Sequence, residues 1–344
     1  YLLRKLTHES LYPDIRLVLL KLRRSVTPCT PYYFFQKMQP FKVHILGCGS
    51  ALPTGRHNPS SQIVEIRGKL FMVDCGEGTQ LSVRKSRLNF TKVYAVFISH
   101  LHGDHVLGLV GMISTFGLNG RTAPLHIYAP GEYEELLQLE LKTFCGGLDF
   151  EVVFHAVDTN KQQIIYEDRS ITVESIPLCH RVHCCGFLFR EKEGSRHIRR
   201  DMIDFYGIPT SQINNIKAGL DWTSPEGEVI KNELLTESPD PVRSYAYCSD
   251  TRYMPELAER VKDVTLLYHE STYTEEFKEK AVKYLHSTAK EAAQTAKDAN
   301  ATQLMLGHYS KRYMNEEPLL KEAKEVFKNT ILSNEGLIVD VRLR

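Results

Sequence analysis

Three histidines and one aspartate are concentrated in one short run of the chain, Ser-His-Leu-His-Gly-Asp-His at residues 99–105. The run follows one apolar segment and precedes another. Because side chains alternate along a strand, His100 and His102 project to the same side of a strand end, and the following turn brings Asp104 and His105 in from another direction. Imidazole and carboxylate groups in this arrangement suit two metal ions better than one. The plain alternative is a histidine-rich surface loop.

Two metal ions need more ligands than one loop supplies, so further His or Asp residues are expected at the ends of other strands. The sequence offers three such residues at or soon after the ends of predicted strands: His180, Asp250 and His308. His183 lies three residues after His180 and is an alternative to it. Ligation by nitrogen and oxygen with few ligands for each ion leaves positions open for water, which indicates a catalytic metal site and not a structural one.

Short β-branched runs and longer periodic stretches predict the elements that position these side chains. The predicted strands are Phe41–Leu46, Gln62–Ile66, Leu70–Val73, Val93–Ser99, Leu125–Tyr128, Glu151–Phe154, Ile171–Ile176, Ser244–Ser249, Val264–His269, Gln303–Leu306 and Gly336–Val341. The predicted helices are Val106–Phe116, Glu132–Phe144, Thr274–Leu285, Ala289–Ala299 and Glu317–Phe327. This succession predicts an α/β fold with one large core. The stretch from about Glu191 to Pro241 breaks the rhythm with charges, Gly and Pro, and is predicted to be an insertion.

The overall composition is that of a globular protein. The 344 residues carry 43 Lys and Arg against 42 Asp and Glu, a formal charge of +1, and 42% are hydrophobic. These proportions exclude a disordered chain and a protein that coats nucleic acid by bulk charge, and the sequence has no apolar run that suggests a membrane span. Eight scattered cysteines without a Cys-x-x-Cys pair indicate reduced thiols, so we expect a cytoplasmic protein.

Residues 1–37 differ in composition from the rest of the chain. They contain seven Lys or Arg and two acidic residues, a net charge of +5, whereas the remainder carries about −4. One interpretation is a basic amphipathic helix that touches RNA. We favour the other, an N-terminal extension that is not part of the native protein, followed by a single domain at residues 38–344 with an inserted arm at about residues 191–241.

The pattern His-x-His-x-Asp-His at residues 100–105 resembles the signature of the metallo-β-lactamase fold, an αββα sandwich with a dinuclear metal site at one edge. Further segments narrow the resemblance to the ribonuclease Z family, which trims the 3′ trailer from precursor tRNA. They are residues 47–56; Asp-Cys-Gly-Glu-Gly-Thr-Gln at 74–80; Ser-Asp-Thr-Arg at 249–252; His-Glu-Ser-Thr at 269–272; His-Ser-Thr at 286–288; and Gly-His-Tyr-Ser-Lys-Arg-Tyr at 307–313. The resemblance extends from about residue 41 to the end.

The resemblance implies two Zn²⁺ ions per chain, although the ligand types also admit Mn²⁺ or another divalent metal. It assigns one ion to His100, His102 and His180, the other to Asp104, His105 and His308, and a bridging position to Asp250. It further implies that Asp104 accepts the proton of the attacking water and that Glu270 and His286 form an oriented acid pair for the leaving group. The implied products are a tRNA with a 3′-hydroxyl and a trailer with a 5′-phosphate.

Substrate binding is predicted from arginines outside the ligand set. Arg312 follows His308 by four residues, so it is either a surface charge or a bidentate phosphate clamp, and we favour the clamp. The other predicted contacts are Arg56 and the basic cluster of the arm: Arg196, Arg199 and Arg200. The arm departs from many family members because residues 207–212 lack a Gly-Pro pair. The implied partners are precursor tRNA and a second copy of the chain in a homodimer, with no membrane.

Three alternatives stay open at the level of sequence. Asp74 either caps the helix that follows or orients a ligand imidazole. The fold also serves hydrolases of small phosphodiesters or thioesters, a reading that leaves the insertion without a use. A binding module that kept the scaffold without catalysis is the third alternative, and it does not explain why all seven ligand positions carry His or Asp.

Overall fold

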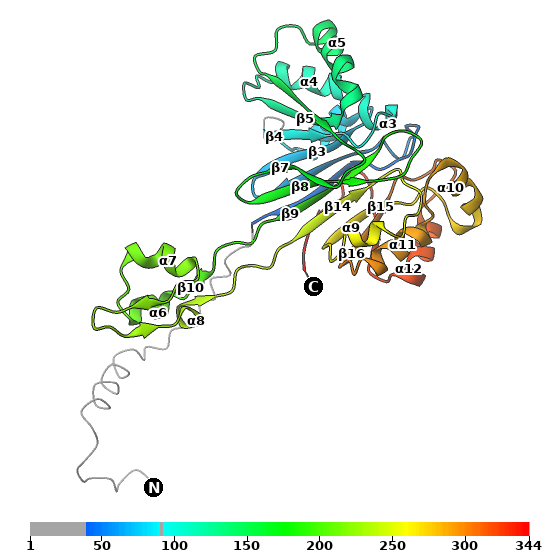
Figure 1. Cartoon of the computed structure of the whole chain (residues 1–344). Helices are drawn as coiled ribbons and strands as arrows, with labels where there is room; N and C mark the ends of the chain where they lie inside the picture. The colour runs from blue at the N-terminus through cyan, green and yellow to red at the C-terminus, as the bar shows by residue number, and fades with distance from the viewer. Residues whose placement is uncertain (1–38, 90–91, 344) are drawn as a thin grey trace, which may run out of the picture. The chain divides into compact units, whose positions relative to one another are not determined.

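The computed structural model describes residues 39–89 and 92–343, and the predictions for residues 1–37 lie outside this range. Two seven-stranded sheets form the framework (Figure 1). The first, in spatial order, contains β18 (Ile338–Asp340), β1 (Phe41–Gly47), β2 (Ser61–Ile66), β3 (Lys69–Cys75), β4 (Val93–Phe97), β5 (Leu125–Pro130) and β6 (Val152–Val157). The second contains β17 (Thr330–Leu332), β16 (Gln303–Gly307), β15 (Leu266–Glu270), β14 (Ser244–Cys248), β9 (Cys185–Glu191), β8 (Ile171–Pro177) and β7 (Gln163–Glu167).

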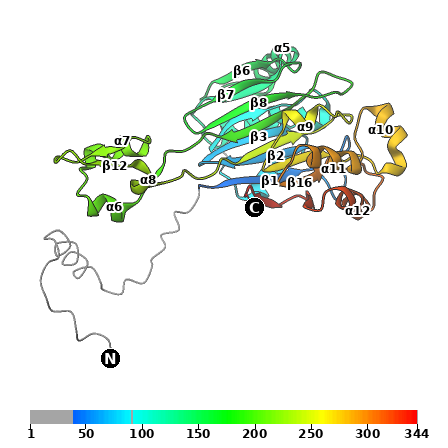
Figure 2. The same cartoon turned by 60° about the horizontal axis from the view of Figure 1, so that its bottom comes forward.

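Helices connect the strands and cover the outer faces of the sheets. On the first sheet they are α2 (Thr79–Ser86), α3 (Gly103–Val106), α4 (Leu109–Leu118) and α5 (Glu134–Phe144). The helices that follow β14 are α9 (Leu257–Arg260), α10 (Lys278–Tyr284), α11 (Ala289–Asp298) and α12 (Glu317–Val326). Figure 1 shows α4 and α5 beside one sheet, and Figures 1 and 2 show α11 and α12 beside the other.

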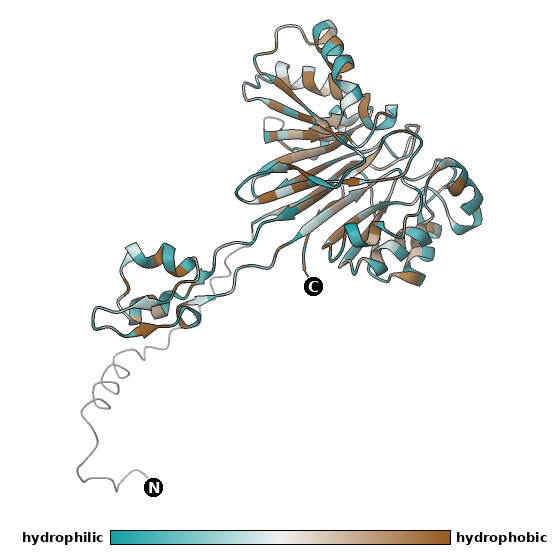
Figure 3. Ribbon diagram, viewed as in Figure 1, coloured by the Kyte–Doolittle hydropathy of each residue, from teal (hydrophilic) through white to brown (hydrophobic). Residues whose placement is uncertain are grey.

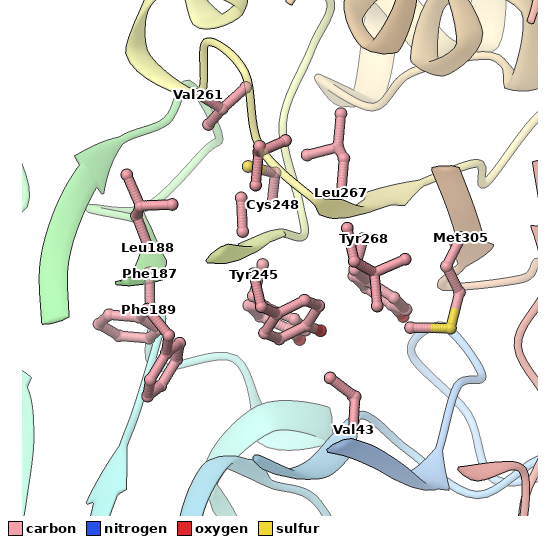
Figure 4. Packing of buried hydrophobic residues seen from close by; sticks show 14 of the residues in the cluster. Val43, Phe187, Leu188, Phe189, Tyr245, Cys248, Val261, Leu267, Tyr268 and Met305 are labelled. Atoms are coloured by element: carbon pink, nitrogen blue, oxygen red, sulfur yellow. The ribbon is translucent and has the colours of Figure 1, made fainter. Parts of the chain in front are cut away.

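The largest apolar core lies between the two sheets. Phe71 of β3 packs against Phe189 of β9 with ring centroids 5.9 Å apart, and Phe97 lies 5.4 Å from Phe187 in the same way. Figure 4 shows further members of this core, and the brown strand segments of Figure 3 show how apolar the strands are. Burial of such aromatic rings is the main force that holds the sheets face to face.

Each sheet buries its second face under helices. Met112, Ile113 and Phe116 of α4 belong to the apolar cluster of the first sheet. On the second sheet, α11 presents a row of fully buried alanines, whose small side chains permit close approach of the helix. Layers of helix, sheet, sheet and helix make an αββα sandwich, so the predicted fold is confirmed.

The predicted elements differ from the observed ones mainly at their ends. Residues 106–116 and 274–285 were each expected to be one helix, but residues 107 and 108 separate α3 from α4, and Glu275–Phe277 forms a 3₁₀ turn before α10. Several short elements were missed, among them α2, β7, α9 and β17 and the small helices and strands between β9 and β14. Each has a mixed polar and apolar composition and borrows its stability from neighbouring elements, which a local pattern does not reveal.

The chain between β9 and β14 forms a small unit with its own apolar cluster. It contains β10 (His197–Ile198), α6 (Arg200–Phe205), α7 (Ile213–Lys217), β11 (Trp222–Thr223), β12 (Val229–Ile230), α8 (Asn232–Leu235) and β13 (Thr236–Glu237). Ile203, Ile216, Trp222 and Leu235 are buried together inside it. We call residues 192–243 the arm. Two antiparallel pairs, β10 with β13 and β11 with β12, close it.

Two further observations concern the whole described range. None of its helices combines the length and the apolar character needed to cross a bilayer. All seven cysteines in it are free thiols, and every one except Cys179 is buried.

Candidate metal centre

The predicted ligands come from the ends of strands in both sheets. His100, His102, Asp104 and His105 follow β4 of the first sheet. Asp250 and His308 follow the parallel strands β14 and β16 of the second sheet, and His180 follows β8. Because the carboxyl ends of parallel strands meet at one edge, residues far apart in the chain converge there.

The first group consists of three imidazoles around one carboxylate. His102 Nδ1 lies 3.0 Å from His100 Nε2 and 3.3 Å from His180 Nε2. Asp250 Oδ2 lies 3.6 Å from the Nε2 atoms of both His100 and His180. The four donor atoms lie within 4.8 Å of one another, which is a spacing that a single cation can span.

The second group lies on the other side of the same aspartate. Asp104 Oδ2 is 3.4 Å from His105 Nε2 and 3.6 Å from His308 Nε2. Asp250 Oδ1 lies 3.4 Å from His105 Nε2 and 3.0 Å from His308 Nε2. The two oxygens of Asp250 therefore face different groups, which is the geometry of a carboxylate shared by two cations.

The opposite nitrogens of four of these imidazoles contact fixed partners, so the rings are oriented. His105 Nδ1 lies 2.7 Å from Asp74 Oδ2. The remaining contacts of this kind are His100 Nδ1 to Ser99 Oγ at 3.0 Å, His180 Nδ1 to the Leu285 carbonyl at 3.1 Å, and His308 Nδ1 to Thr272 Oγ at 3.0 Å. Partners of this kind fix the ring orientation and the tautomer of metal-binding histidines.

The structure decides between the two interpretations of Asp74. Helix α2 begins after Gly78 without a side-chain cap, so the capping interpretation is wrong. The Asp74 carboxylate instead accepts hydrogen bonds from the Ser99 backbone N–H at 2.7 Å and from the Tyr247 hydroxyl at 2.7 Å, in addition to its contact with His105.

The electrostatics of the two groups differ. Burial lowers the pKa values of His100, His102 and His180, so these rings are neutral, the form that binds a metal. In the second group, burial alone would lower the pKa of His308, but the carboxylates of Asp250 and Asp104 raise it to about 10. The carboxylates thus give the buried second group a negative electrostatic potential, which favours a bound cation.

Two buried ring nitrogens without hydrogen-bond partners also indicate that the residues fit bound cations. His105 Nε2 and His308 Nε2 are buried and have no hydrogen-bond partner, although a buried polar atom without one costs free energy. Both atoms point at the carboxylates of Asp104 and Asp250. A cation between these atoms would satisfy all of them at once.

The predicted acid pair lies next to the second group. Glu270 is fully buried, and its Oε1 accepts hydrogen bonds from His286 Nδ1 at 2.8 Å and from the Thr251 backbone N–H at 2.7 Å. The Thr272 hydroxyl donates to Glu270 Oε2 at 2.6 Å. Burial opposes a charge on His286, but Glu270 raises its pKa above the ordinary value. His286 is thus held as a proton donor with one fixed face.

Close backbone approaches hold the ligand loop in place. A Cβ on Gly76 would lie 2.4 Å from the Asp104 carbonyl oxygen, and one on Gly108 would lie 2.1 Å from the Gly76 carbonyl oxygen. These positions need glycine because the turn at residues 74–78 packs directly on the loop. The Ala51 backbone N–H also donates to Asp104 Oδ2 at 2.8 Å.

Three of the polar residues at the site adopt a left-handed backbone conformation: Asp74 (φ 55°), Asp250 (φ 61°) and His308 (φ 59°). This region is costly for residues with a side chain, and such strain gathers at functional sites. Asp250 and His308 lie just beyond strand ends, where this turn of the backbone directs their side chains toward the other ligands.

The predicted substrate-binding arginines are in different situations. Arg312 is exposed, and its guanidinium carbon lies 4.6 Å from the Phe277 ring centroid and 4.9 Å from that of Tyr273. Arg56 bonds the Glu316 carboxylate and the Tyr313 and Met314 carbonyl groups, so its donors are already used inside the protein.

In the arm, Arg196 donates to the Thr236 hydroxyl at 2.7 Å, and Arg199 lies 3.6 Å from the Asp201 carboxylate. Arg200 is exposed at the start of α6.

His183, the alternative to His180, is exposed and contacts Glu132, so it does not join the cluster.

Arg181 also lies near the cluster and was missed by the sequence analysis. It is exposed and lines two cavities of about 500 and 370 Å³ that also border His180 and His102. Its neighbour His180 was the signal that could have found it.

Comparisons with known proteins identify the family. The chain is 55% identical over 304 residues to the Ribonuclease Z of Bacteroides fragilis (strain YCH46), an alignment that covers 88% of this chain and 100% of the relative. It is 47% identical over 304 residues to the Ribonuclease Z of Porphyromonas gingivalis (strain W83), again covering 88% and 100%.

Solved structures agree in fold. Human tRNase Z, short form, aligns with a TM-score of 0.64 at 23% identity, covering 88% of this chain and 100% of that one. A family model described as Anti-Pycsar protein Apyc1 matches residues 41–199, which is part of the sandwich and the start of the arm. The resemblance deduced from the motifs is confirmed, since relatives of this identity align along their whole length, and the chain belongs to the ribonuclease Z family of endoribonucleases.

Proposed function

We propose that the protein removes the 3′ trailer from precursor tRNA with two zinc ions, leaving a 3′-hydroxyl on the tRNA and a 5′-phosphate on the trailer. The observation that carries the proposal is the pair of ligand groups that share Asp250. The identity to the Ribonuclease Z of Bacteroides fragilis supports tRNA as the substrate.

Seven side chains would hold the ions. One ion would be held by His100, His102 and His180, the other by Asp104, His105 and His308, with Asp250 shared. When bound, a pair of divalent cations makes a water molecule acidic enough to act as a nucleophile near neutral pH and offsets the charge of the scissile phosphate. The nitrogen and oxygen ligands also admit Mn²⁺.

Asp104 and His286 move protons in this proposal. Asp104 Oδ2 already accepts the Ala51 N–H and faces two imidazoles, which leaves Oδ1 to accept the proton of the attacking water. Since His286 gives its Nδ1 side to Glu270, only Nε2 is left to protonate the leaving oxygen. Glu270 orients the ring, and Thr272 and Thr251 hold Glu270 in place.

Arginines bind the RNA in this proposal. Arg312, supported by two aromatic rings, is suited to a bidentate contact with a phosphate near the cut. Arg181, at the cavities beside His102 and His180, is suited to a neighbouring phosphate. The arm residues Arg196, Arg199 and Arg200 would bind the tRNA backbone away from the cut. Arg56 supports the loop at residues 47–60 more than it contacts RNA.

Two further parts of the proposal concern the state of the protein. A reducing compartment such as the cytoplasm is supported by the unpaired thiols of the described residues. A homodimer is supported by the family resemblance alone. Light scattering tests it by giving the molar mass of the protein in solution.

The test is cleavage of a 3′-extended tRNA with and without a chelator. We expect one cut behind the mature tRNA end, sensitivity of the tRNA product to periodate, which requires a free 3′-terminal diol, and loss of activity with the chelator. Asp250→Ala should abolish cleavage, whereas Asp221→Ala, which removes an exposed carboxylate of the arm, should not.

Two results would overturn this proposal. Cleavage of a small chromogenic phosphodiester without any cleavage of the RNA would assign the protein to another hydrolase class of this fold. Purified protein that binds no metal and cleaves neither substrate would indicate a module without catalysis.

A further inference from the structure

The His57 imidazole lies between two carboxylates on the inner side of the loop at residues 47–60. Its Nδ1 is 2.9 Å from Glu335 Oε2, and its Nε2 is 3.1 Å from Glu316 Oε1. The side chain of His57 is 7% exposed, and that of Glu316 is 10% exposed. Both ring nitrogens thus face acceptors in a place with little water, which requires two N–H donors and therefore the imidazolium form.

This ion pair network connects three separate parts of the chain. Glu316 lies at the start of α12, and Glu335 lies in the turn before β18. Glu335 Oε1 also accepts the Asn58 backbone N–H at 2.9 Å, and Glu316 also binds Arg56. Two carboxylates from the C-terminal part of the chain therefore hold both the side chain and the backbone of the loop.

The same loop reaches the metal centre. Its Ser50 N–H donates to the Tyr309 carbonyl at 3.0 Å, and the Tyr309 N–H donates to the Cys48 carbonyl at 3.0 Å. Tyr309 directly follows His308, a proposed ligand. One residue further along, the Ala51 N–H donates to Asp104 Oδ2 at 2.8 Å. The loop thus contacts the backbone beside one ligand and the carboxylate of another.

We propose that His57, held as a cation between Glu335 and Glu316, is a positioning residue for ribonuclease activity. It fixes the loop so that the Ala51 N–H stays on Asp104, the residue that receives the proton of the attacking water. The proposal rests on the proposed function and deepens it, because it makes the geometry of Asp104 depend on a charge at His57.

A metal ion at this place is the competing interpretation. Cys48 Sγ lies 3.4 Å from His57 Nδ1 and 3.7 Å from Glu335 Oε1, so the three groups are close enough to hold an ion. A metal would need a neutral ring and a thiolate. Burial and the charge of Glu335 raise the pKa of the Cys48 thiol well above its ordinary value, and two carboxylates favour the imidazolium. Both facts favour the ion pair.

The charge on His57 sets a pH window. Burial alone would lower the pKa of His57, but Glu335 and Glu316 raise it above the ordinary value. The stabilisation that the His57 cation gives to the folded loop is therefore complete below the ordinary histidine pKa. It is lost as pH rises through the raised pKa. For Glu335, burial acts to raise the pKa, but the contact with His57 outweighs it and the pKa is lowered. The stabilisation from the Glu335 carboxylate is therefore lost only as pH falls through that lowered pKa. The other titratable groups around the ring are Cys48, Arg56 and Tyr309.

The test compares His57→Gln, His57→Arg and wild type in kcat and KM on a 3′-extended tRNA at neutral and alkaline pH. We expect His57→Gln to lower kcat about tenfold with little change in KM, because a misplaced proton acceptor slows the chemical step. His57→Arg should restore kcat and remove the part of the alkaline decline that comes from loss of this charge. His44→Gln is the matched control, since His44 contacts a single carboxylate, Glu65, at 3.1 Å, and should leave kcat unchanged.

Two measurements do not depend on activity. Nitrogen NMR of labelled histidine should show His57 doubly protonated at neutral pH, and Glu335→Gln should shift it toward the neutral form. Zinc transfer to a chromogenic chelator should be faster from His57→Gln than from wild type, and His57→Arg should reverse this.

The inference would be overturned by a neutral His57 at neutral pH, by a third metal ion that Cys48→Ser removes, or by equal kcat values for His57→Gln and wild type. If the wild-type enzyme does not cleave the RNA at all, the proposed function fails instead, and the NMR measurement still decides the charge of His57.

Discussion

His105 Nδ1 lies 2.7 Å from Asp74 Oδ2, and both side chains are completely buried. The contact links the end of β3 to α3, the short helix that follows β4 and carries two of the predicted ligands. Because the Asp74 carboxylate also accepts the Ser99 N–H and the Tyr247 hydroxyl, it is fixed from several directions. It can therefore orient the His105 ring so that Nε2 faces the second ligand group.

Replacing this carboxylate by an amide should weaken the second ion site. Asn tolerates the left-handed backbone at position 74, so Asp74→Asn changes mainly the charge. We expect metal affinity or kcat to fall by about 10- to 100-fold, the usual cost of losing such a partner. Tyr247→Phe, which removes one donor and keeps the carboxylate, should cost much less. Equal metal affinity in Asp74→Asn and wild type would refute the orienting role.

The Thr272 hydroxyl is predicted to be needed because it bonds both Glu270 and the ring of His308. Thr272→Val keeps the shape and removes the hydroxyl, so His308 Nδ1 loses its side-chain partner and the buried Glu270 carboxylate loses one of its hydrogen bonds. We expect kcat to fall by about tenfold or more. Thr272→Ser keeps the hydroxyl and should stay near wild type. Equal kcat values for Thr272→Val and Thr272→Ser would show that the hydroxyl is not needed for activity.

Arg312 should act on the RNA phosphate and not on the fold, since it is exposed and rests on the Phe277 and Tyr273 rings. Arg312→Ala should lower kcat/KM on a precursor tRNA by about tenfold or more, because charge-assisted bidentate contacts are among the stronger hydrogen bonds. Lys311→Ala removes the adjacent exposed cation and serves as the control. Equal losses in the two variants would indicate a general charge effect.

The arm should contribute to binding alone. The double variant Arg199→Gln with Arg200→Gln should raise KM for precursor tRNA and leave the hydrolysis of a small phosphodiester unchanged. The slope of log affinity against log salt should fall by about one for each phosphate contact removed. Lys231→Gln is the matched control, because Lys231 is already paired with Asp221 at 2.9 Å. A loss of activity on the small ester would show that the arm is not a separate binding element.

Much of the site could be predicted from the sequence because its ligands follow apolar strands. A strand end with His at every second position is visible as spacing alone, and His180, Asp250 and His308 each lie shortly after the end of a strand. The αββα layering follows from the fold that this signature resembles. Local patterns also predicted most strands, since buried β-branched runs are distinctive.

Apart from Asp74, most residues that support the ligands could not be predicted, because nothing in the local sequence marks them. Thr272 and His308 are 36 positions apart, and Tyr247 and Asp74 are 173 apart. The carbonyl of Leu285 orients His180 through a backbone atom that every residue possesses. His57 has no pattern of partners in the local sequence, and only the folded chain brings Glu316 and Glu335 to it.

The central claim is that two cations bind on opposite sides of the Asp250 carboxylate. The most direct measurement is crystallography of the zinc-loaded protein with anomalous scattering at the zinc edge. We predict two peaks, one among His100, His102 and His180 and one among Asp104, His105 and His308, with Asp250 contacting both. A single peak, or zinc bound elsewhere with this cluster closed by hydrogen bonds alone, would contradict the account.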